Sequence, residues 1–356
     1  MERATPPKPL PSPPSRPPSE LPGTNRIGSL TRSNLVYTPP IGQYGAWIPL
    51  DAWAREHQWT PPQRGAGRTN PLCQLGSPNG MLALNVGSRQ ATFDGVNYWL
   101  GFAPAAANGR VFVHGLDAFN NLRPLGESPV PPTAHRRMIV IDPGHGGDNT
   151  GAHSVVNHAS EKEYTLDWAL RLESLLATNG WQVVLTRTND VDVGLTNRVA
   201  IAERANADLF ISLHFNSGSP RQDLAGLETF CLTPVGLPST LTRDFEDETE
   251  RAFPNNAFDD QNLQLAFGLH RALLAATGMA DRGIRRARFM GVIRGQNRPA
   301  VLLEAGYLSN PNEARLIATA AFRQKLAEAV AHTLTAPNVR PARAATPPAS
   351  GTPAAP

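Results

Sequence analysis

Cysteine is scarce in this chain, which has only two in 356 residues. Cys73 and Cys231 lie far apart, neither belongs to a CxxC pair, and neither stands beside a histidine that could activate it. These absences exclude CxxC redox motifs and zinc-finger spacing, so the sequence favours a structural or free thiol at each position. Two such residues do not indicate a redox compartment.

Long hydrophobic runs are also missing. No stretch approaches the 18 apolar residues that a membrane-spanning helix needs, so we expect no transmembrane segment. The N-terminus lacks the apolar core of a signal peptide; an exported protein would need a signal missing from this sequence or a different start site. A GxSxG nucleophile elbow is absent as well, which disfavours a serine hydrolase.

Lysine is rare, and the net charge of +3 comes almost entirely from arginine. Lys8, Lys162 and Lys325 are the only lysines. No Lys/Arg run and no RNA-binding aromatic motif is present, so we expect no nucleic-acid partner. A composition bias explains the arginines best, and attraction to a weakly anionic polymer stays open.

Proline is abundant at both ends and marks the domain organisation. The first 22 residues contain nine prolines, and Pro, Ala and Thr dominate the last twenty. Such segments have too few apolar side chains to offset their ordering entropy. We predict a disordered Pro-rich arm over 1–34, a small β-rich accessory domain over 35–125, a linker over 126–136, a catalytic domain over 137–335 and a disordered tail over 336–356.

Short alternating runs in residues 81–113 predict strands, and Asp94-Gly95 is a two-residue hairpin signal. Ala46–Leu50, Ala91–Leu100 and Asn108–Val113 resemble the copper amine oxidase N-terminal-like domain of bacterial envelope proteins. The resemblance implies an accessory or wall-associated module without copper chemistry.

From residue 137 apolar strands alternate with amphipathic helices, which predicts an α/β fold with a twisted, mostly parallel sheet flanked by helices. In such sheets ligands bind beyond the carboxyl ends of the strands. His145 follows one strand, while His214 and Glu304 close two others. Glu161 begins the helix after the first strand, on the same edge. The four residues are therefore expected to meet.

Each of the four has an alternative role, such as a helix-dipole partner for Glu161. However, Ser160 and Glu163 already have capping-box spacing, which leaves Glu161 as a surplus acid. Two histidines and a glutamate form a ligand set for a hydrolytic zinc with an open position. We therefore predict one zinc ion, with Glu304 as an acid/base group.

At these residues the chain resembles the zinc-dependent, type 3 N-acetylmuramoyl-L-alanine amidases. The matching segments are Ile141–Gly147, Ser160–Lys162, Leu185–Asp190, Ala207–Asn216, Asp281–Ile284 and Pro299–Asn310. The resemblance implies that His145, Glu161 and His214 bind zinc and that Glu304 is catalytic. It implies hydrolysis of the amide between N-acetylmuramic acid and L-alanine in peptidoglycan, by activated water with a glutamate general base and acid.

Three further residues are candidates for supporting roles. Asn216 could orient substrate or form a turn, and Arg294 could contact a lactyl or stem carboxylate or form a surface ion pair. Asp142 could accept a hydrogen bond from a ligand histidine or serve the turn. Where the family has a Gly-rich loop, His153 and His158 are either loop decoration or spare groups near the substrate.

Two other functions stay open: a zinc peptidase acting within the stem peptide, and a non-catalytic peptidoglycan-binding protein. The expected partners are peptidoglycan or muropeptides, with an envelope activator protein as a further possibility. The function implies the cell envelope, periplasm or exterior, although no signal peptide is visible.

Overall fold

The computed structural model describes residues 47–65, 72–127, 137–242 and 246–336. The predicted arm over 1–34, and most of the predicted linker and tail, lie outside these ranges. The proposed domain boundaries therefore stay predictions.

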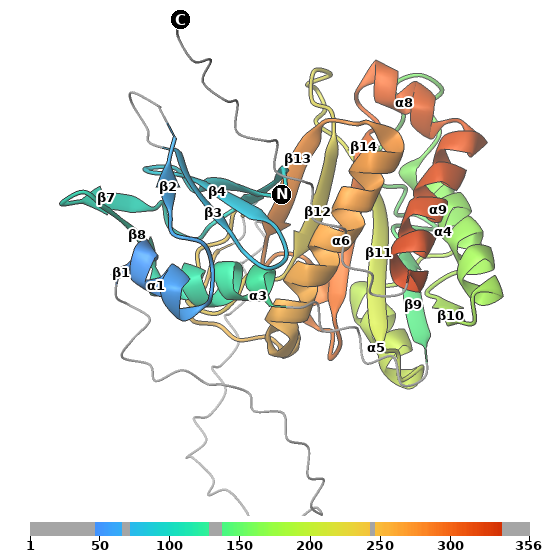
Figure 1. Cartoon of the computed structure of the whole chain (residues 1–356). Coiled ribbons are helices and arrows are strands. Elements are labelled where there is room, and N and C mark those ends of the chain that lie inside the picture. Colours follow the sequence, from blue (N-terminus) through green and yellow to red (C-terminus); the bar gives the residue numbers. More distant parts are fainter. Residues whose placement is uncertain (1–46, 66–71, 128–136, 243–245, 337–356) are drawn as a thin grey trace, which may run out of the picture. The chain divides into compact units, whose positions relative to one another are not determined.

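An eleven-stranded sheet organises the described residues, in the order β10-β9-β11-β14-β12-β13-β6-β5-β4-β3-β2 (Figure 1). Its strands from the C-terminal part of the chain are β9 (Met138–Pro143), β10 (Gln182–Leu185), β11 (Leu209–Asn216), β12 (Leu227–Cys231), β13 (Asp281–Arg286) and β14 (Ala300–Tyr307). They pair in parallel, except that β12 runs antiparallel to β14. The predicted α/β class is confirmed, as a mixed sheet flanked by helices.

The N-terminal strands continue this sheet as an antiparallel meander. They are β2 (Gln63–Arg64), β3 (Leu72–Gly76), β4 (Met81–Asn85), β5 (Gln90–Phe93) and β6 (Val96–Trp99). Asp94 and Gly95 both have positive φ and close the predicted hairpin between β5 and β6. β6 then pairs in parallel with β13 at Tyr98 and Ile284.

A second, three-stranded sheet has the order β1-β8-β7, formed by Trp47–Pro49, Arg110–His114 and Ala105–Ala107. The short helix α1 (Leu50–Glu56) contacts β8, and the helical run from α2 (Gly115–Asp117) through α3 (Arg123–Gly126) contacts α6.

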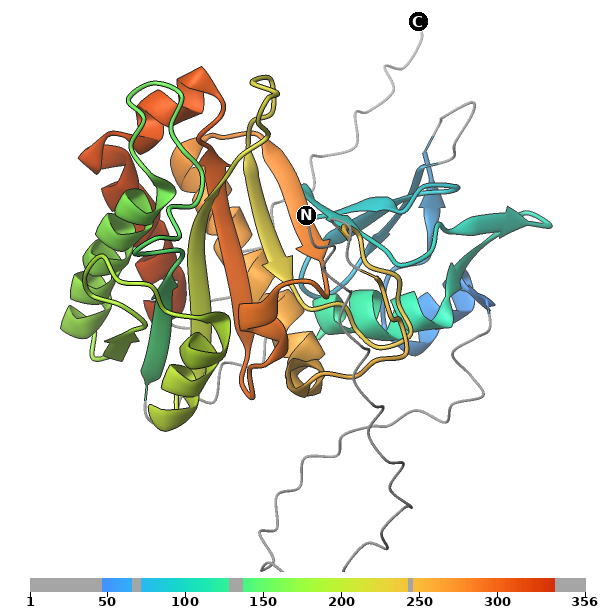
Figure 2. The ribbon, with the colours of Figure 1, turned by 180° about the vertical axis from the view of Figure 1, so that it is seen from behind.

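Helices cover both faces of the large sheet (Figures 1 and 2). On one face lie α4 (Glu161–Thr178), α6 (Asp259–Thr277) and α9 (Ala320–Thr335), which contact one another in sequence α4–α9–α6. α5 (Leu195–Arg204) and α7 (Gly291–Arg294) pack together on the other face. α8 (Pro311–Ile317) follows β14. Within the described residues, no helix has the length and apolar character required to cross a membrane.

Two apolar clusters fill the faces of the sheet. The smaller one joins Val140, Phe210 and Leu302 to residues of α5 and α7. The larger one lies under α4, α6 and α9 and includes side chains of the N-terminal strands. Phe267 of α6, for example, meets the rings of Phe93 and Tyr98, with centroids 5.7 and 5.4 Å away. The N-terminal strands therefore share a core with the helices.

Candidate active site

His145 is presented by the loop that ends the buried strand β9. Ile139, Val140 and Ile141 have no exposed surface, and the chain leaves the sheet after Pro143, the last residue of the strand. His145 has a φ of 63°, which is uncommon for a residue with a side chain and occurs often at functional sites. Its carbonyl accepts a hydrogen bond from Arg198 at 2.8 Å, and its Nδ1 lies 2.8 Å from Asn149 Oδ1.

Glu161 is the first residue of α4, and its side chain turns inward. The capping function belongs to Glu163, whose carboxylate accepts a hydrogen bond from the Ser160 N–H at 2.9 Å. Glu161 is only 3% exposed and accepts hydrogen bonds from the backbone N–H groups of Ala152 and Phe215. The predicted division between a structural and a surplus acid is thus confirmed by the contacts.

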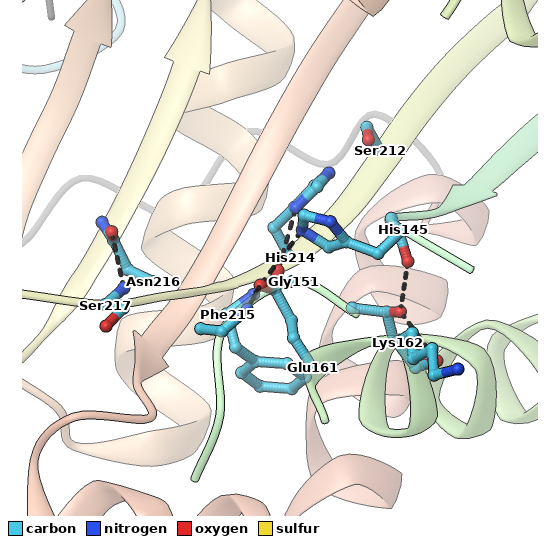
Figure 3. Close-up of polar contacts among 12 residues, drawn as sticks. His145, Gly151, Glu161, Lys162, Ser212, His214, Phe215, Asn216 and Ser217 are labelled. Carbon is cyan, nitrogen blue, oxygen red and sulfur yellow. Dashed lines mark hydrogen bonds and ion pairs between the residues drawn. The ribbon is translucent and has the colours of Figure 1, made fainter. Parts of the chain in front are cut away.

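His214 on β11 completes a cluster with these two residues (Figure 3). Its Nδ1 lies 3.0 Å from one Glu161 oxygen, and His145 Nε2 lies 3.1 Å from the other. The three potential ligand atoms all lie within 4.8 Å of one another, so the cluster could hold a metal ion. The sequence prediction that these three residues converge is borne out by these distances.

Electrostatics keep Glu161 ionised. Burial raises the pKa of its carboxyl group, but hydrogen bonds and charge interactions with His145 and His214 outweigh burial and hold that pKa well below its usual range. A buried carboxylate facing two ring nitrogens is a donor set that suits a divalent cation such as zinc.

Gly151 leaves the space in which this cluster fits. A Cβ at this position would lie 2.6 Å from both Glu161 Oε2 and His145 Cδ2, and its φ of 68° favours glycine independently. The close approach of the loop to the cluster therefore requires a residue without a side chain.

Two buried arginines hold the loop before His145. Arg187 donates to the carbonyl groups of Pro143, Gly144 and Lys162, which joins the loop to the start of α4. Arg198 of α5 pairs with Asp142 at 2.5 Å, with side chains only 4% and 1% exposed.

The carboxylate of Asp142 also accepts hydrogen bonds from Thr186 and Ser212. Its contacts are thus with these hydroxyls and with Arg198, while Asn149 is the partner of the His145 ring. Asn149 therefore makes the kind of hydrogen bond to the histidine ring that the sequence suggested for Asp142.

Replacement of Arg198 by methionine is expected to lower the free energy of unfolding by about 3–5 kcal/mol, because Asp142 would keep a buried charge without its cation. Urea unfolding monitored by circular dichroism measures this change. Arg204→Met on the same helix is the matched control, since Arg204 is exposed, with an expected change within about 0.5 kcal/mol. Equal unfolding free energies for the two variants would contradict the structural role of the pair.

Glu304 lies beside the cluster on β14. It is the register partner of His214 on β11, and Glu228 of β12 is its partner on the other side. Because paired residues on neighbouring strands project from the same face of a sheet, His214, Glu304 and Glu228 form a row. Glu304 is 7% exposed, so the row is largely shielded from solvent.

The other predicted residues lie at differing positions. Asn216 donates to Glu228 at 2.8 Å, next to the row. Arg294 of α7 lies over the ring of Phe253, 5.4 Å from its centroid. His153 contacts Thr150 and the His158 carbonyl, so both histidines belong to the loop and not to the cluster.

Glu228 is a residue that sequence reasoning missed. It is 5% exposed and contacts Asn216, Tyr307, Arg282 and Arg285. The available signal was a carboxylate inside the apolar run Leu227–Leu232, because burial of such a group requires partners.

Comparisons with known proteins match the region that holds this site. Residues 139–336 match the family described as N-acetylmuramoyl-L-alanine amidase. The chain is 33% identical over 217 residues to N-acetylmuramoyl-L-alanine amidase AmiA of Escherichia coli (strain K12), which covers 55% of this chain and 74% of that protein. It is 35% identical over 199 residues to N-acetylmuramoyl-L-alanine amidase CwlM of Bacillus licheniformis, with 55% and 66% covered.

Among solved structures, the catalytic domain of CwlV, the N-acetylmuramoyl-L-alanine amidase from Bacillus (Paenibacillus) polymyxa var. colistinus, is 34% identical. The match covers 56% of this chain and 96% of that one, with a TM-score of 0.46. The family match includes the cluster and Glu304, whereas β1 to β8 lie outside it.

Proposed function

Because the chain belongs to the N-acetylmuramoyl-L-alanine amidase family, we propose that it is a zinc hydrolase that cleaves the amide between the lactyl group of N-acetylmuramic acid and L-alanine of the stem peptide. One observation carries the mechanism: the ligand atoms of His145, Glu161 and His214 lie within 4.8 Å of one another, with Glu304 in the paired position beside His214.

The residues of the cluster fit one zinc ion. His145 would offer Nε2, His214 would offer Nδ1, and Glu161 would offer a carboxylate oxygen, since these atoms already face one another. The contact between His145 Nδ1 and Asn149 Oδ1 favours the tautomer that leaves Nε2 free to bind a metal. Two histidines, one glutamate and an open position are the ligand pattern of hydrolytic zinc sites. Zinc bound there would lower the pKa of water and polarise the amide carbonyl.

Glu304 would move the proton. Its carboxylate would accept a proton from the attacking water and return it to the departing nitrogen, first as general base and then as general acid. The balanced reaction consumes one water, breaks the C–N bond, and leaves a lactyl carboxylate and a free alanine amine.

The activity is tested by mass spectrometry of peptidoglycan digested by the full chain, with zinc and with a chelator. Release of intact stem peptides only in the presence of zinc is the expected result. Cuts within the stem would move the assignment to a peptidase. A folded, zinc-loaded chain that binds the polymer without releasing peptide would indicate a binding protein.

The site of action follows from the substrate. We propose that the chain works on peptidoglycan or muropeptides in the cell envelope, periplasm or exterior. A requirement for an activator protein is tested by the same digestion, with and without an envelope extract.

A further inference from the structure

The row of side chains that contains Glu304 continues away from the metal cluster. After His214, Glu304 and Glu228 it reaches β13, where Arg282 and Arg285 both point their Nε atoms at Glu228 Oε1, at 3.2 and 3.5 Å. The sheet therefore leads from the proposed zinc ligands, through the proposed acid/base residue, to two guanidinium groups.

A cleft of about 240 Å³ lies at this end of the row. Its lining includes Asn216, Ser217, Glu228, Arg282, Arg285 and Tyr307. Asn216 and Tyr307 both donate to Glu228 Oε2. These hydrogen bonds fix the position of the Glu228 carboxylate in the lining of the cleft. Its two partners, Arg282 and Arg285, line the same cleft.

The charges of this cleft are unequal. One buried carboxylate, Glu228, faces the two guanidinium groups, which leaves a formal excess of one positive charge. Within the part of the chain that the structure describes, the terminal Nη atoms of Arg282 and Arg285 make no hydrogen bond. Guanidinium groups bind carboxylates through two parallel hydrogen bonds, so these nitrogens suit an incoming carboxylate.

The N-terminal strands hold Arg285 in place. Its guanidinium lies over the ring of Trp99 at 3.5 Å from the centroid, a cation–π contact. Trp99 ends β6, the strand that pairs with β13. At Gly283, whose φ is 83°, a Cβ would come within 2.3 Å of the Trp99 ring, so the two strands meet closely here.

The distance from Glu304 on β14 to the arginines on β13 is close to the length of a short extended peptide. Neighbouring strands are about 4.8 Å apart, so β13 lies about 10 Å from β14. Two extended residues span about 7 Å, and an arginine side chain that projects into the cleft shortens the remaining distance. A carboxylate one or two residues beyond the scissile amide could therefore reach these guanidinium groups while the amide lies at Glu304.

We propose that the cleft is a stem-peptide subsite in which Arg282 and Arg285, supported by Trp99, bind the carboxylate of the second stem residue. The inference rests on the proposed amidase function and adds a specificity to it. It also gives the N-terminal strands a direct role in substrate selection.

A competition between two forms of peptidoglycan tests the inference. The two forms carry either the free carboxylate or its carboxamide at the second stem residue, and mass spectrometry distinguishes the released peptides. In an equimolar mixture, the ratio of initial release rates equals the ratio of the two kcat/KM values, and this ratio is independent of the fraction of folded enzyme. We expect the full chain to prefer the carboxylate by about tenfold or more, the effect of hydrogen bonds to a charged group.

Arg285→Lys keeps the positive charge beside Glu228 but loses the planar guanidinium group with its two parallel N–H donors. Trp99→Leu removes the aromatic ring against which the Arg285 guanidinium lies. Both are expected to lower the preference severalfold. The matched controls are Arg204→Met and Trp47→Leu, because Arg204 and Trp47 are exposed, and both should keep the wild-type ratio.

The possible failures are distinguishable. Equal release of both peptides by the wild-type chain would overturn the subsite and leave the amidase function intact. An unchanged preference in Trp99→Leu would overturn the role of the N-terminal strands. Release of neither peptide by zinc-loaded protein, both with and without an envelope extract, would overturn the proposed function itself.

Discussion

Replacement of Glu304 by glutamine is expected to lower kcat for stem-peptide release by about a hundred- to ten-thousand-fold, the usual contribution of a general acid–base group. Glutamine has nearly the same shape but cannot accept the proton. The substitution changes none of the three proposed ligands, so zinc content should stay near that of the wild type. Timed release of stem peptides, with metal analysis of the same samples, measures both quantities.

Glu328→Gln is the matched control, because Glu328 is an exposed glutamate on α9. It should have wild-type activity and stability. A Glu304→Gln variant that retains more than about a tenth of the wild-type kcat would contradict the acid/base assignment. Loss of zinc in that variant would instead assign Glu304 to the metal cluster.

Removal of a proposed ligand is expected to have a similarly large effect on metal binding. His214→Ala should lower zinc affinity by more than about 100-fold, since loss of an outer hydrogen-bond partner alone lowers metal affinity 10- to 100-fold. Activity should fall in parallel. Dialysis against buffers of fixed free zinc, followed by elemental analysis, gives the affinity without reference to catalysis.

His332→Ala controls for the loss of a histidine, because His332 is exposed on α9. It should bind zinc as the wild type does. Should His214→Ala keep both full zinc stoichiometry and affinity, the His214 ligand assignment would be wrong.

The convergence of the four central residues could be predicted from local patterns. Strands β9, β11 and β14 are runs of apolar residues, and such runs predict buried strands. A polar residue at or beyond the carboxyl end of such a strand lies at the edge of the sheet where ligands bind. The start of the helix at Glu161 is predicted by the capping-box spacing of Ser160 and Glu163. These signals depend only on residues close together in the chain.

β13 could not be predicted in this way. Its sequence, Asp281–Arg286, has three arginines and no alternation of apolar residues, and no strand is predicted there from the sequence. The partners of these arginines are distant in the chain: Arg285 contacts Glu228 and Trp99, and Arg286 contacts Asn120 and Asn121. Tertiary pairing overrides local propensity here.

The burial of the two arginines that contact the loop before His145 could not be predicted from the sequence either. Arg187 and Arg198 are each 3% exposed, although arginine is ordinarily a surface residue. Most of their partners are backbone carbonyl groups, and those of Pro143, Gly144 and His145 are among them. Every residue has a backbone carbonyl group, so the sequence does not show which of these groups an arginine contacts. The burial of the two arginines therefore cannot be predicted from neighbouring residues.

The pairing of β6 with β13 has a consequence for where the chain can be cut. A fragment starting at residue 137 would retain the family match but would leave β13 with one open edge and Phe267 without its aromatic neighbours. An uncovered strand edge beside exposed apolar surface is a template for aggregation. We therefore expect a well-behaved fragment to include β5 and β6, which makes it larger than the region shared with the family.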